Sequence, residues 1–485
     1  MEFDIPVAAH AQPRLSEHIY VDADILRTRF AVAMSNMYKA EVPLYEDLVS
    51  IVQGVNQSVL ANYNTKDSVE RITLERHGAI RLGSPYELQV VRRIFGLLGM
   101  HPIGYYDLSI AGLPMHATCF RPRDAESLAK NPFRVFTTLL RPELLQSLEA
   151  REQALSLLQQ RKIFSDVLLD IMSIAESQQG RFTYDQAEIF VDNALESFRW
   201  QSVAAATFDM YNTLKKEHPI LADIVCFQTA HINHLTPRTL NIDLAQAAMQ
   251  AHGMEVKDRI EGPPKRGCPI LLRQTSFLAL QEAVSFASSS NHPEKLIDSY
   301  HKARFGEIEE RGAALTPAGR KLYDELFDEA METAWTTGQK MDETVAKVFI
   351  KYPDTWNELR RRGLIFCEFT PTGKLLPIHL AKHDEKRGDF LEQLVLAEIV
   401  SAVPITYEDF LPFSAAGIFQ SNLGNSSSSA MGQKKPYPDQ ETFVKSLGCE
   451  ILDSNTLYAG IQRKSIENCA HQLGLSAFDL IRDLP

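Results

Sequence analysis

An internal repeat is the feature of this chain that most constrains its fold. The segments "RHGAIRLGSPYELQVVRRIFGLLGMHPIGYYDL" and "NHLTPRTLNIDLAQAAMQAHGMEVKDRIEG" carry the same landmarks in the same order. Each starts near a histidine that an arginine follows four residues later, His77 with Arg81 and His234 with Arg238. Each also contains a predicted helix that ends in Gly-Met. Such self-similarity indicates a duplicated supersecondary unit.

The first copy predicts the element order βαβββ. Residues 70–82 have the composition of a strand, and residues 84–100 have helical spacing with Ser84 as the N-cap and Pro85 at the first helical position. Gly99 suits the C-terminal cap of this helix. Three short strands are then expected at 103–110, 115–122 and 133–140.

The second copy predicts a similar order. A strand is expected at 231–239, followed by a helix that Asn241 caps. Thr316 is expected to cap a further helix after the repeat. Three more strands are expected at 256–262, 269–280 and 304–312, the last after a polar loop around "SSSNHPEK".

Helical segments flank the first copy. Apolar residues at three- and four-residue steps predict helices over much of 23–65 and 142–230. We therefore expect a chain of the α+β class. Its predicted segments are an N-terminal helical segment (1–70), a first βαβββ module (71–141), a helical insertion (142–230), a second βαβββ module (231–312) and a C-terminal helical and mixed region (313–485) with a loop near 407–423.

The composition argues against nucleic acid and a membrane as partners. Among 485 residues, 50 basic and 62 acidic residues leave a net charge of -12, so the basic surface that nucleic acid requires is absent. An anionic substrate would have to be held by local Arg or Lys side chains, because the overall field does not attract it. The longest apolar stretch, "FLEQLVLAEIVSAVPI", is too short and too charged to span a bilayer.

Cysteine usage favours a reducing compartment. None of the six cysteines forms a C-x-x-C pair, so neither a disulfide framework nor a cysteine-rich zinc site is implied. The first residues, "MEFDIPVAAHAQPRLSEH", lack the apolar core of a signal peptide. We therefore expect a cytoplasmic protein.

Strand alternation groups the residues that carry chemistry. Side chains four residues apart share one face of a strand, so His77 and Arg81 are expected to point the same way. Glu307 and Glu309 share a face of the last predicted strand. A buried carboxylate is costly unless it is paired or binds a metal, and two histidines with one carboxylate suit non-haem Fe(II) that handles O2. The alternative that each histidine is a satisfied core residue stays open.

Four segments together resemble a known family. The segments "RHGAIR", "HINHLTPR", "RFGEIEERG" and "YEDFLPFSAAGIFQSNL" are similar to those of the bacterial 2-oxoadipate dioxygenase/decarboxylase family, and the resemblance covers nearly the whole chain. The repeated unit resembles the vicinal-oxygen-chelate fold of hydroxymandelate synthase and 4-hydroxyphenylpyruvate dioxygenase. The resemblance implies two βαβββ modules that form one curved sheet or barrel around a metal, with large helical insertions.

The resemblance also implies the roles of individual residues. His77, His234 and Glu307 would be the Fe(II) ligands, with Glu307 preferred to Glu309 because "EIEER" is similar to the corresponding ending in related dioxygenases. Arg81 would hold a substrate carboxylate, which a guanidinium fork can bind through two hydrogen bonds. The implied catalytic residues are His77, Arg81, His234 and Glu307, and the implied substrate contacts are His77, Arg81, Phe413 and Ser414.

The reaction implied by the resemblance joins a 2-oxo acid and O2 at Fe(II). The substrate would supply the electrons that reduce O2, so no separate 2-oxoglutarate would be needed. With 2-oxoadipate the products would be 2-hydroxyglutarate and CO2, a step of lysine degradation. Small molecules are thus the implied partners, and the long helices are compatible with an oligomer.

Two other interpretations of the sequence remain. A glyoxalase-like Zn(II) or Ni(II) isomerase or lyase would use similar His and Glu ligands but would consume no O2. A non-catalytic ligand-binding module would keep the histidines in core roles and use the helical segments as a partner surface. Serine and cysteine nucleophile chemistry is disfavoured, because the chain has no G-x-S-x-G motif and no cysteine in a recognisable nucleophile context.

Overall fold

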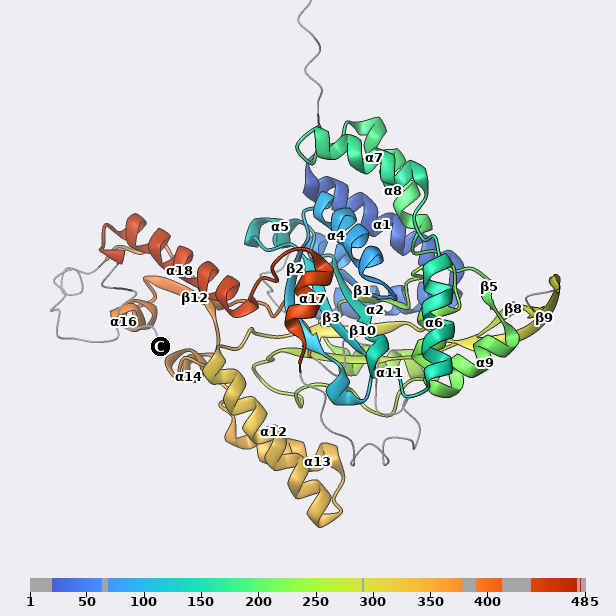
Figure 1. Cartoon of the computed structure of the whole chain (residues 1–485). Coiled ribbons are helices and arrows are strands. Elements are labelled where there is room, and N and C mark those ends of the chain that lie inside the picture. The colour runs from blue at the N-terminus through green and yellow to red at the C-terminus, as the bar shows by residue number, and fades with distance from the viewer. Residues whose placement is uncertain are drawn as a thin grey trace, which may run out of the picture.

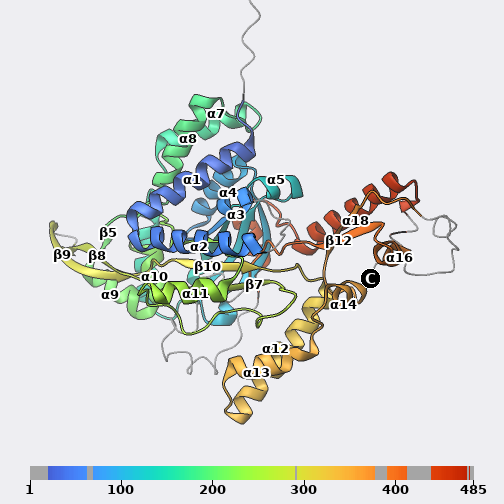
Figure 2. The same cartoon turned by 180° about the vertical axis from the view of Figure 1, so that it is seen from behind.

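A mixed β-sheet with helices packed around it forms the centre of the molecule (Figure 1). The structure is a computed structural model and describes residues 20–62, 69–289, 292–376, 390–411, 438–477 and 480. Helices α1 (Ala23–Glu41) and α2 (Pro43–Asn62) cross in front of the sheet in the view from behind (Figure 2).

Five strands form the central sheet, in the order β2-β3-β4-β1-β6. Their bounds are Arg76–Leu82 for β1, His101–Asp107 for β2, Met115–Arg121 for β3, Arg134–Leu140 for β4 and His234–Pro237 for β6. β1 runs parallel to β4, and the other neighbours are antiparallel. β6 belongs to the second copy of the repeat and pairs with β1 of the first, with Ala79 opposite His234 and His77 opposite Thr236. The two copies therefore meet at the strands that carry their histidines.

The remaining described strands form three small sheets, β10-β7, β11-β12 and β5-β8-β9. Their bounds are Val203–Thr207 for β5, Leu272–Ser276 for β7, Gln281–Ser289 for β8, His292–Lys302 for β9, Glu307–Arg311 for β10, Cys367–Pro371 for β11 and Val400–Pro404 for β12. β10 lies beside the end of β6, where Arg238 and Glu309 form an isolated bridge and the Thr239 N–H donates to the Glu309 carbonyl at 2.7 Å. The predicted α+β class is confirmed. The described strands form open sheets, however, and do not close into a barrel.

Three of the other described helices, α4 (Pro85–Leu97), α11 (Ile242–Ala251) and α12 (Pro317–Thr337), have the N-caps that the sequence predicts. The remaining described helices are α3 (Val69–Leu74), α5 (Ala125–Lys130), α6 (Leu148–Gln160), α7 (Asp166–Ser177), α8 (Tyr184–Glu196), α9 (Phe208–Glu217), α10 (Pro219–Val225), α13 (Met341–Val348), α14 (Trp356–Arg361), α16 (Phe390–Leu396), α17 (Gln440–Leu447) and α18 (Ser454–Leu473). The side chains of Ser84, Asn241 and Thr316 each accept a hydrogen bond from a first-turn N–H. Gly99 and Gly253 follow α4 and α11 with φ of +70° and +81°, which glycine adopts without steric cost. None of the described helices combines the length and apolar character of a membrane span.

Two hydrophobic clusters cover the two faces of the central sheet. On one face, Ile80 and Leu82 of β1 pack with side chains of α1, α2, α4, α7 and α8. Ala79 points to the other face and packs in the cluster formed with β4, α6, α9 and α10. Because side chains alternate along a strand, His77 and Arg81 share the face of Ala79. Both chemically active side chains of β1 therefore point to the same side of the sheet.

Three predictions of secondary structure are wrong in detail. Residues 70–74 belong to helix α3 and not to the strand, and only Ile72 of α3 is buried. Residues 256–262 form isolated bridges and no strand. At the loop predicted around "SSSNHPEK", residues 288–289 belong to β8 and residues 292–295 to β9, whose antiparallel pair projects from the body of the molecule (Figure 1), and residues 290–291 lie outside the described residues. β8 buries only Val284 and Phe286, so the apolar alternation that predicts a strand is weak there.

Part of the described chain beyond β10 lies away from the central sheet, whereas Glu408, Phe410 and helix α17 return to it. Helices α12 and α13 form an arm that points away from the sheet, and α18 packs along β11 on another side (Figure 1). The division of the chain into segments at residues 71, 142, 231 and 313 stays a prediction.

A buried ion network supports the chain just before β1. The carboxylate of Glu75 is fully buried and pairs with Arg134 at 2.8 Å and with Arg238 at 3.0 Å. Arg311 lies 3.8 Å away, and Arg134 also pairs with Glu408. Burial opposes ionisation of Glu75, but the surrounding arginines lower its pKa to about 2. The charged carboxylate therefore ties β4, the end of β6 and β10 together.

Replacing Glu75 by Gln should destabilise the fold, because the substitution leaves the surrounding arginines buried without their counter-charge. We expect the free energy of unfolding to fall by about 3 kcal/mol, measured by urea denaturation. The control Glu126→Gln changes a side chain that is 83% exposed on α5 and should alter the free energy by less than about 0.5 kcal/mol. Similar small effects of both substitutions would mean that the network contributes little.

Candidate metal centre

Three side chains with metal-binding spacing converge where the two copies meet. His77 comes from β1, His234 from β6 and Glu307 from β10, and one ligand atom of each lies within 4.8 Å of the other two. The two histidines are each 1% exposed, and Glu307 is fully buried. In the part of the chain that the structure describes, this is the one group of three or more His, Cys, Asp or Glu side chains with such spacing.

Buried polar atoms of this cluster lack a hydrogen-bond partner in the protein. They are Nε2 of His77, Nδ1 of His234 and Oε1 of Glu307. Nε2 of His77 lies 3.0 Å from Oε2 of Glu307, but the geometry of this contact is not that of a hydrogen bond. Buried polar atoms are nearly always paired, so three such atoms together indicate a ligand site. Two imidazoles and a carboxylate fit a divalent metal.

A second carboxylate orients His77. Oε2 of Glu309 lies 2.9 Å from Nδ1 of His77, and Arg311 donates to both Glu309 oxygens at 2.9 and 2.8 Å. Burial opposes the charge on Glu309, but Arg311 and His77 hold its pKa well below the ordinary value. We assign the Nδ1–H tautomer to His77, since an ionised carboxylate can only accept. Nε2 then keeps its lone pair for a metal, as in carboxylate–histidine–metal arrangements.

Neutral donors hold Glu307. The Thr236 hydroxyl and the Gln274 amide both donate to Oε2, at 2.9 and 2.8 Å. Both contacts involve one oxygen, which leaves Oε1 without a partner. The carboxylate is thus fixed in orientation before any ligand arrives.

Aromatic rings enclose the cluster. Phe410 packs edge-on against His77 with 4.9 Å between ring centroids, and Phe305 stacks on His234 at 4.7 Å. Burial lowers the pKa of His234 well below its ordinary value, and the positive charges of a protonated His77 and of Arg81 lower it further. His234 is therefore neutral near pH 7, which is the state that binds a metal.

Arg81 approaches the cluster from the same face of β1. Its side chain is 9% exposed, and Nη1 pairs with Oδ2 of Asp223 on α10 at 2.5 Å. Its charge is also among those that lower the pKa of His234. The structure thus places Arg81 on the face of β1 that carries His77, where its charge acts on His234.

Comparison with known proteins decides the family. A family model described as 2-oxoadipate dioxygenase/decarboxylase matches residues 30–422. Curated proteins of that name from Escherichia coli (strain K12) and Pseudomonas putida are 45% and 43% identical to this chain. The matches cover 93% and 94% of this chain and 98% and 99% of those proteins. The chain belongs to the 2-oxoadipate dioxygenase/decarboxylase family.

A solved structure shares the whole fold. The crystal structure of the hydroxyglutarate synthase from Pseudomonas putida in complex with 2-oxoadipate matches with a TM-score of 0.81 at 42% identity. The match covers 94% of this chain and 99% of that one. The family predicted from the four sequence segments is thereby confirmed. A dioxygenase/decarboxylase family implies a metal cofactor, and the cluster of His77, His234 and Glu307 could hold it.

Two of the predicted site residues have no described position in this family member. Phe413 and Ser414 lie outside the described residues. The described chain reaches the site three residues before Phe413, where Phe410 packs on His77.

The arginine of the second copy of the repeat belongs to the buried ion network and not to the metal cluster. Arg238 corresponds to Arg81 in the repeat, but it pairs with Glu75 in the ion network. Sequence analysis also missed Asp223, although an aspartate within the apolar run "ILADIVCF" signals a buried charge with a partner. No sequence pattern indicated Gln274 as a site residue, because its hydrogen bond to Glu307 depends on the pairing of β7 with β10.

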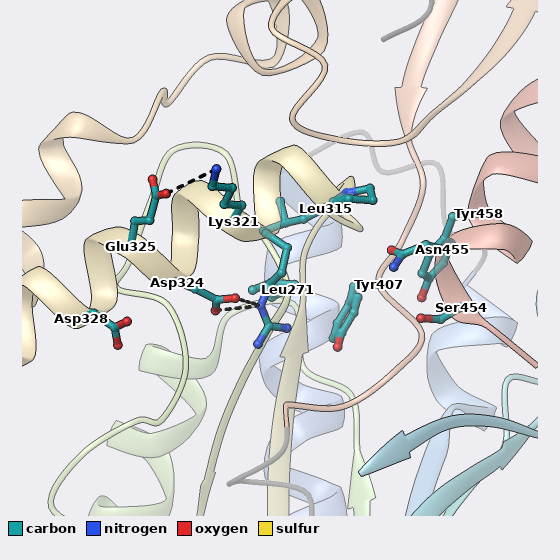
Figure 3. Close-up of a pocket in the computed structure, with 12 residues that line it drawn as sticks. Leu271, Leu315, Lys321, Asp324, Glu325, Asp328, Tyr407, Ser454, Asn455 and Tyr458 are labelled. Atoms are coloured by element: carbon teal, nitrogen blue, oxygen red, sulfur yellow. Dashed lines mark hydrogen bonds and ion pairs between the residues drawn. The ribbon is translucent and has the colours of Figure 1, made fainter. Parts of the chain in front are cut away.

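A surface groove lies apart from the metal cluster. It has a volume of about 510 Å³ and is bounded by the start of α12, by Tyr407 and by the start of α18 (Figure 3). Four of its charged side chains pair with one another, Arg320 with Asp324 at 2.8 Å and Lys321 with Glu325 at 3.9 Å. None of the described site residues lines this groove, so it has no part in the chemistry of the cluster.

Replacing Glu309 by Gln should weaken metal binding without removing a ligand, because His77 loses the anion that fixes its tautomer. We expect the affinity for Co(II), titrated by calorimetry into metal-free protein, to fall about 10- to 100-fold. Glu310→Gln on the opposite face of β10 is the matched control and should leave the affinity unchanged. Equal affinities of the Glu309 variant and the wild type would refute the orienting role.

Proposed function

We propose that the protein is an Fe(II)-dependent dioxygenase that converts 2-oxoadipate and O2 into 2-hydroxyglutarate and CO2. The observation that carries this proposal is the buried cluster of His77, His234 and Glu307 with its three unpartnered polar atoms. Family membership supports the reaction class, and the similar structure that holds 2-oxoadipate supports the substrate. The step would belong to lysine degradation in the cytoplasm.

The donor set favours Fe(II). Two imidazoles and one carboxylate that leave open positions are typical of non-haem Fe(II) oxygenases. Catalytic zinc sites can use the same ligands, so membership of a dioxygenase family is what favours Fe(II) over zinc. When bound, Fe(II) would polarise the 2-oxo acid and activate O2 for reduction.

The histidines would bind a metal through neutral rings. Burial opposes a charge on His77, but Glu309 and Glu307 raise its pKa, so a metal at Nε2 would displace a proton there. His234 is kept neutral by burial and by neighbouring positive charge. Glu309 accepts a hydrogen bond from Nδ1–H of His77 and so leaves the Nε2 lone pair for the site. Glu307 would add one negative charge, which offsets part of the charge of a divalent metal.

Arg81 would bind the distal carboxylate of the substrate, which is the carboxylate farther from the 2-oxo group. A guanidinium matches a carboxylate through two parallel hydrogen bonds and keeps its charge at any physiological pH. Arg81 lies on the same face of β1 as His77, four residues or two strand repeats further along. This placement would orient a dicarboxylic acid with one end at His77 and the other at Arg81. Substrate contacts by Phe413 and Ser414 stay a prediction.

The aromatic enclosure would exclude water from the reaction. Phe410 and Phe305 cover the two histidine rings, and the three ligand side chains are buried. Exclusion of water strengthens each electrostatic contact and limits side reactions with water.

The reaction balances without a further reductant. The bond between C1 and C2 of 2-oxoadipate breaks, and C1 leaves as CO2. C2 becomes a new carboxylate and C3 gains a hydroxyl group, so both atoms of O2 enter the organic product. All electrons that reduce O2 come from the substrate.

Oxygen uptake tests the proposed function. Fe(II)-loaded protein supplied with 2-oxoadipate should consume O2 and release CO2 and 2-hydroxyglutarate in equal amounts. His77→Ala should abolish uptake, because the variant lacks one of the predicted ligands. Metal-loaded protein that consumes no O2 with any 2-oxo acid would contradict the proposal and would favour glyoxalase-like chemistry.

Arg81→Lys tests the substrate clamp separately. Lysine keeps the charge but loses the fork, so the KM for 2-oxoadipate should rise by about tenfold. The affinity for Fe(II) should stay unchanged, because Arg81 holds no metal. Steady-state kinetics identical to those of the wild type would rule Arg81 out as the clamp.

A further inference from the structure

Asp223 is a buried charge outside the metal cluster. It lies on α10, whose sequence "PILADIV" is otherwise apolar, and its side chain is 5% exposed. Burial opposes its ionisation, yet Arg81 and His231 hold its pKa well below the ordinary value. A buried charge is costly unless hydrogen bonds satisfy it, so the partners of Asp223 define its role.

Four donors surround the Asp223 carboxylate. Oδ2 accepts from Nη1 of Arg81 at 2.5 Å and from the Asn233 amide at 3.2 Å. Oδ1 lies 3.1 Å from Nε2 of His231 and 2.9 Å from Nε2 of His301. The donors come from β1, from the segment before β6 and from β9. Three separate parts of the chain therefore fix the position of one carboxylate.

The two imidazoles are themselves held in place. The Tyr211 hydroxyl lies 3.1 Å from Nδ1 of His301, and we assign it as the donor, so that Nε2 carries the proton given to Asp223. Trp200 packs edge-on against His231 at 4.7 Å, and Phe227 packs against both imidazole rings at 5.2 and 4.9 Å. The charge of Asp223 is thus shared among fixed N–H donors and is not directed at a ligand.

We propose that Asp223 is a positioning residue that sets substrate specificity through Arg81. By holding Nη1, Asp223 fixes the guanidinium on the face of β1 that carries His77, in the orientation that recognises the distal carboxylate of a dicarboxylic 2-oxo acid. Without this contact the long Arg81 side chain would be free to rotate in the unbound protein and would lose that freedom when substrate binds. An Arg81 side chain that Asp223 already holds avoids this entropic cost. The inference rests on the proposed function, because it requires that Arg81 meets the substrate.

A second buried ion pair provides a matched control. Arg161 pairs with Glu87 at 2.6 Å, and the two side chains are 2% and 4% exposed. Arg161 also donates to the Ile224 carbonyl, so this pair joins α4, the end of α6 and α10. Glu87→Gln therefore removes a carboxylate from an equally buried arginine that serves the fold.

The test compares two 2-oxo acids of equal chain length that differ in the distal carboxylate. 2-Oxoadipate carries this group and 2-oxohexanoate lacks it. Asp223→Asn should raise the KM for 2-oxoadipate about 10- to 100-fold, the effect of one charge-assisted hydrogen bond. The KM for 2-oxohexanoate and the affinity for Fe(II) should change little. Glu87→Gln should alter the KM for neither acid.

Two results would overturn the inference. An unchanged KM for 2-oxoadipate would show that Arg81 needs no positioning by Asp223. An equal rise of KM for both acids would assign Asp223 a purely structural role. Where Asp223→Asn does not fold, Asp223→Glu keeps the charge and shifts the carboxylate by one methylene, and a preserved preference for 2-oxoadipate in that variant would also overturn the inference.

Direct binding separates this inference from the proposed function. Wild-type protein that turns over neither acid would refute the proposed function and leave the role of Asp223 to be measured by binding. Anaerobic calorimetry with Co(II)-loaded protein gives the affinities for both acids. Weaker binding of 2-oxoadipate alone to the Asp223→Asn variant supports the inference, and equal binding to wild type and variant overturns it.

Discussion

The site depends on one imidazole held between two buried carboxylates. Glu307 and Glu309 are two residues apart on β10, so strand alternation places both on one face. Their Oε2 atoms lie 3.0 and 2.9 Å from the two nitrogens of His77. Arg311 takes up the charge of Glu309, whereas Glu307 accepts from neutral side chains of β6 and β7. This difference gives the carboxylates separate roles, since Glu309 orients the ring and Glu307 keeps its charge for a cation.

The duplicated unit explains where the site forms, and the partners of its arginines explain why the two copies are not equivalent. β1 and β6 pair directly, so the rings of His77 and His234 lie 5.5 Å apart. Arg81 turns to Asp223 beside the cluster, whereas Arg238 turns to Glu75 in the ion network. One copy therefore contributes an arginine to the site, and the other contributes an arginine to the stability of the sheet.

Short-range rules made part of this structure predictable. The caps at Ser84 and Asn241 follow from local hydrogen bonding, and the shared face of His77 and Arg81 follows from alternation. Alternation alone cannot tell which of Glu307 and Glu309 is the predicted metal ligand, because the two residues share a face of the strand. Their difference comes from side chains on other strands, which no spacing in the sequence reveals. The sequence pattern also does not predict the β8–β9 hairpin, because β8 buries few apolar side chains.

Labelling with oxygen-18 gas tests the proposed chemistry most directly. Fe(II)-loaded protein that converts 2-oxoadipate under 18O2 should yield 2-hydroxyglutarate with one labelled atom in the new carboxylate and one in the new hydroxyl group. The released CO2 should carry no label. Unlabelled 2-hydroxyglutarate, or label that appears only in CO2, would contradict a reaction in which the substrate both reduces O2 and receives its two oxygen atoms at the cluster of His77, His234 and Glu307.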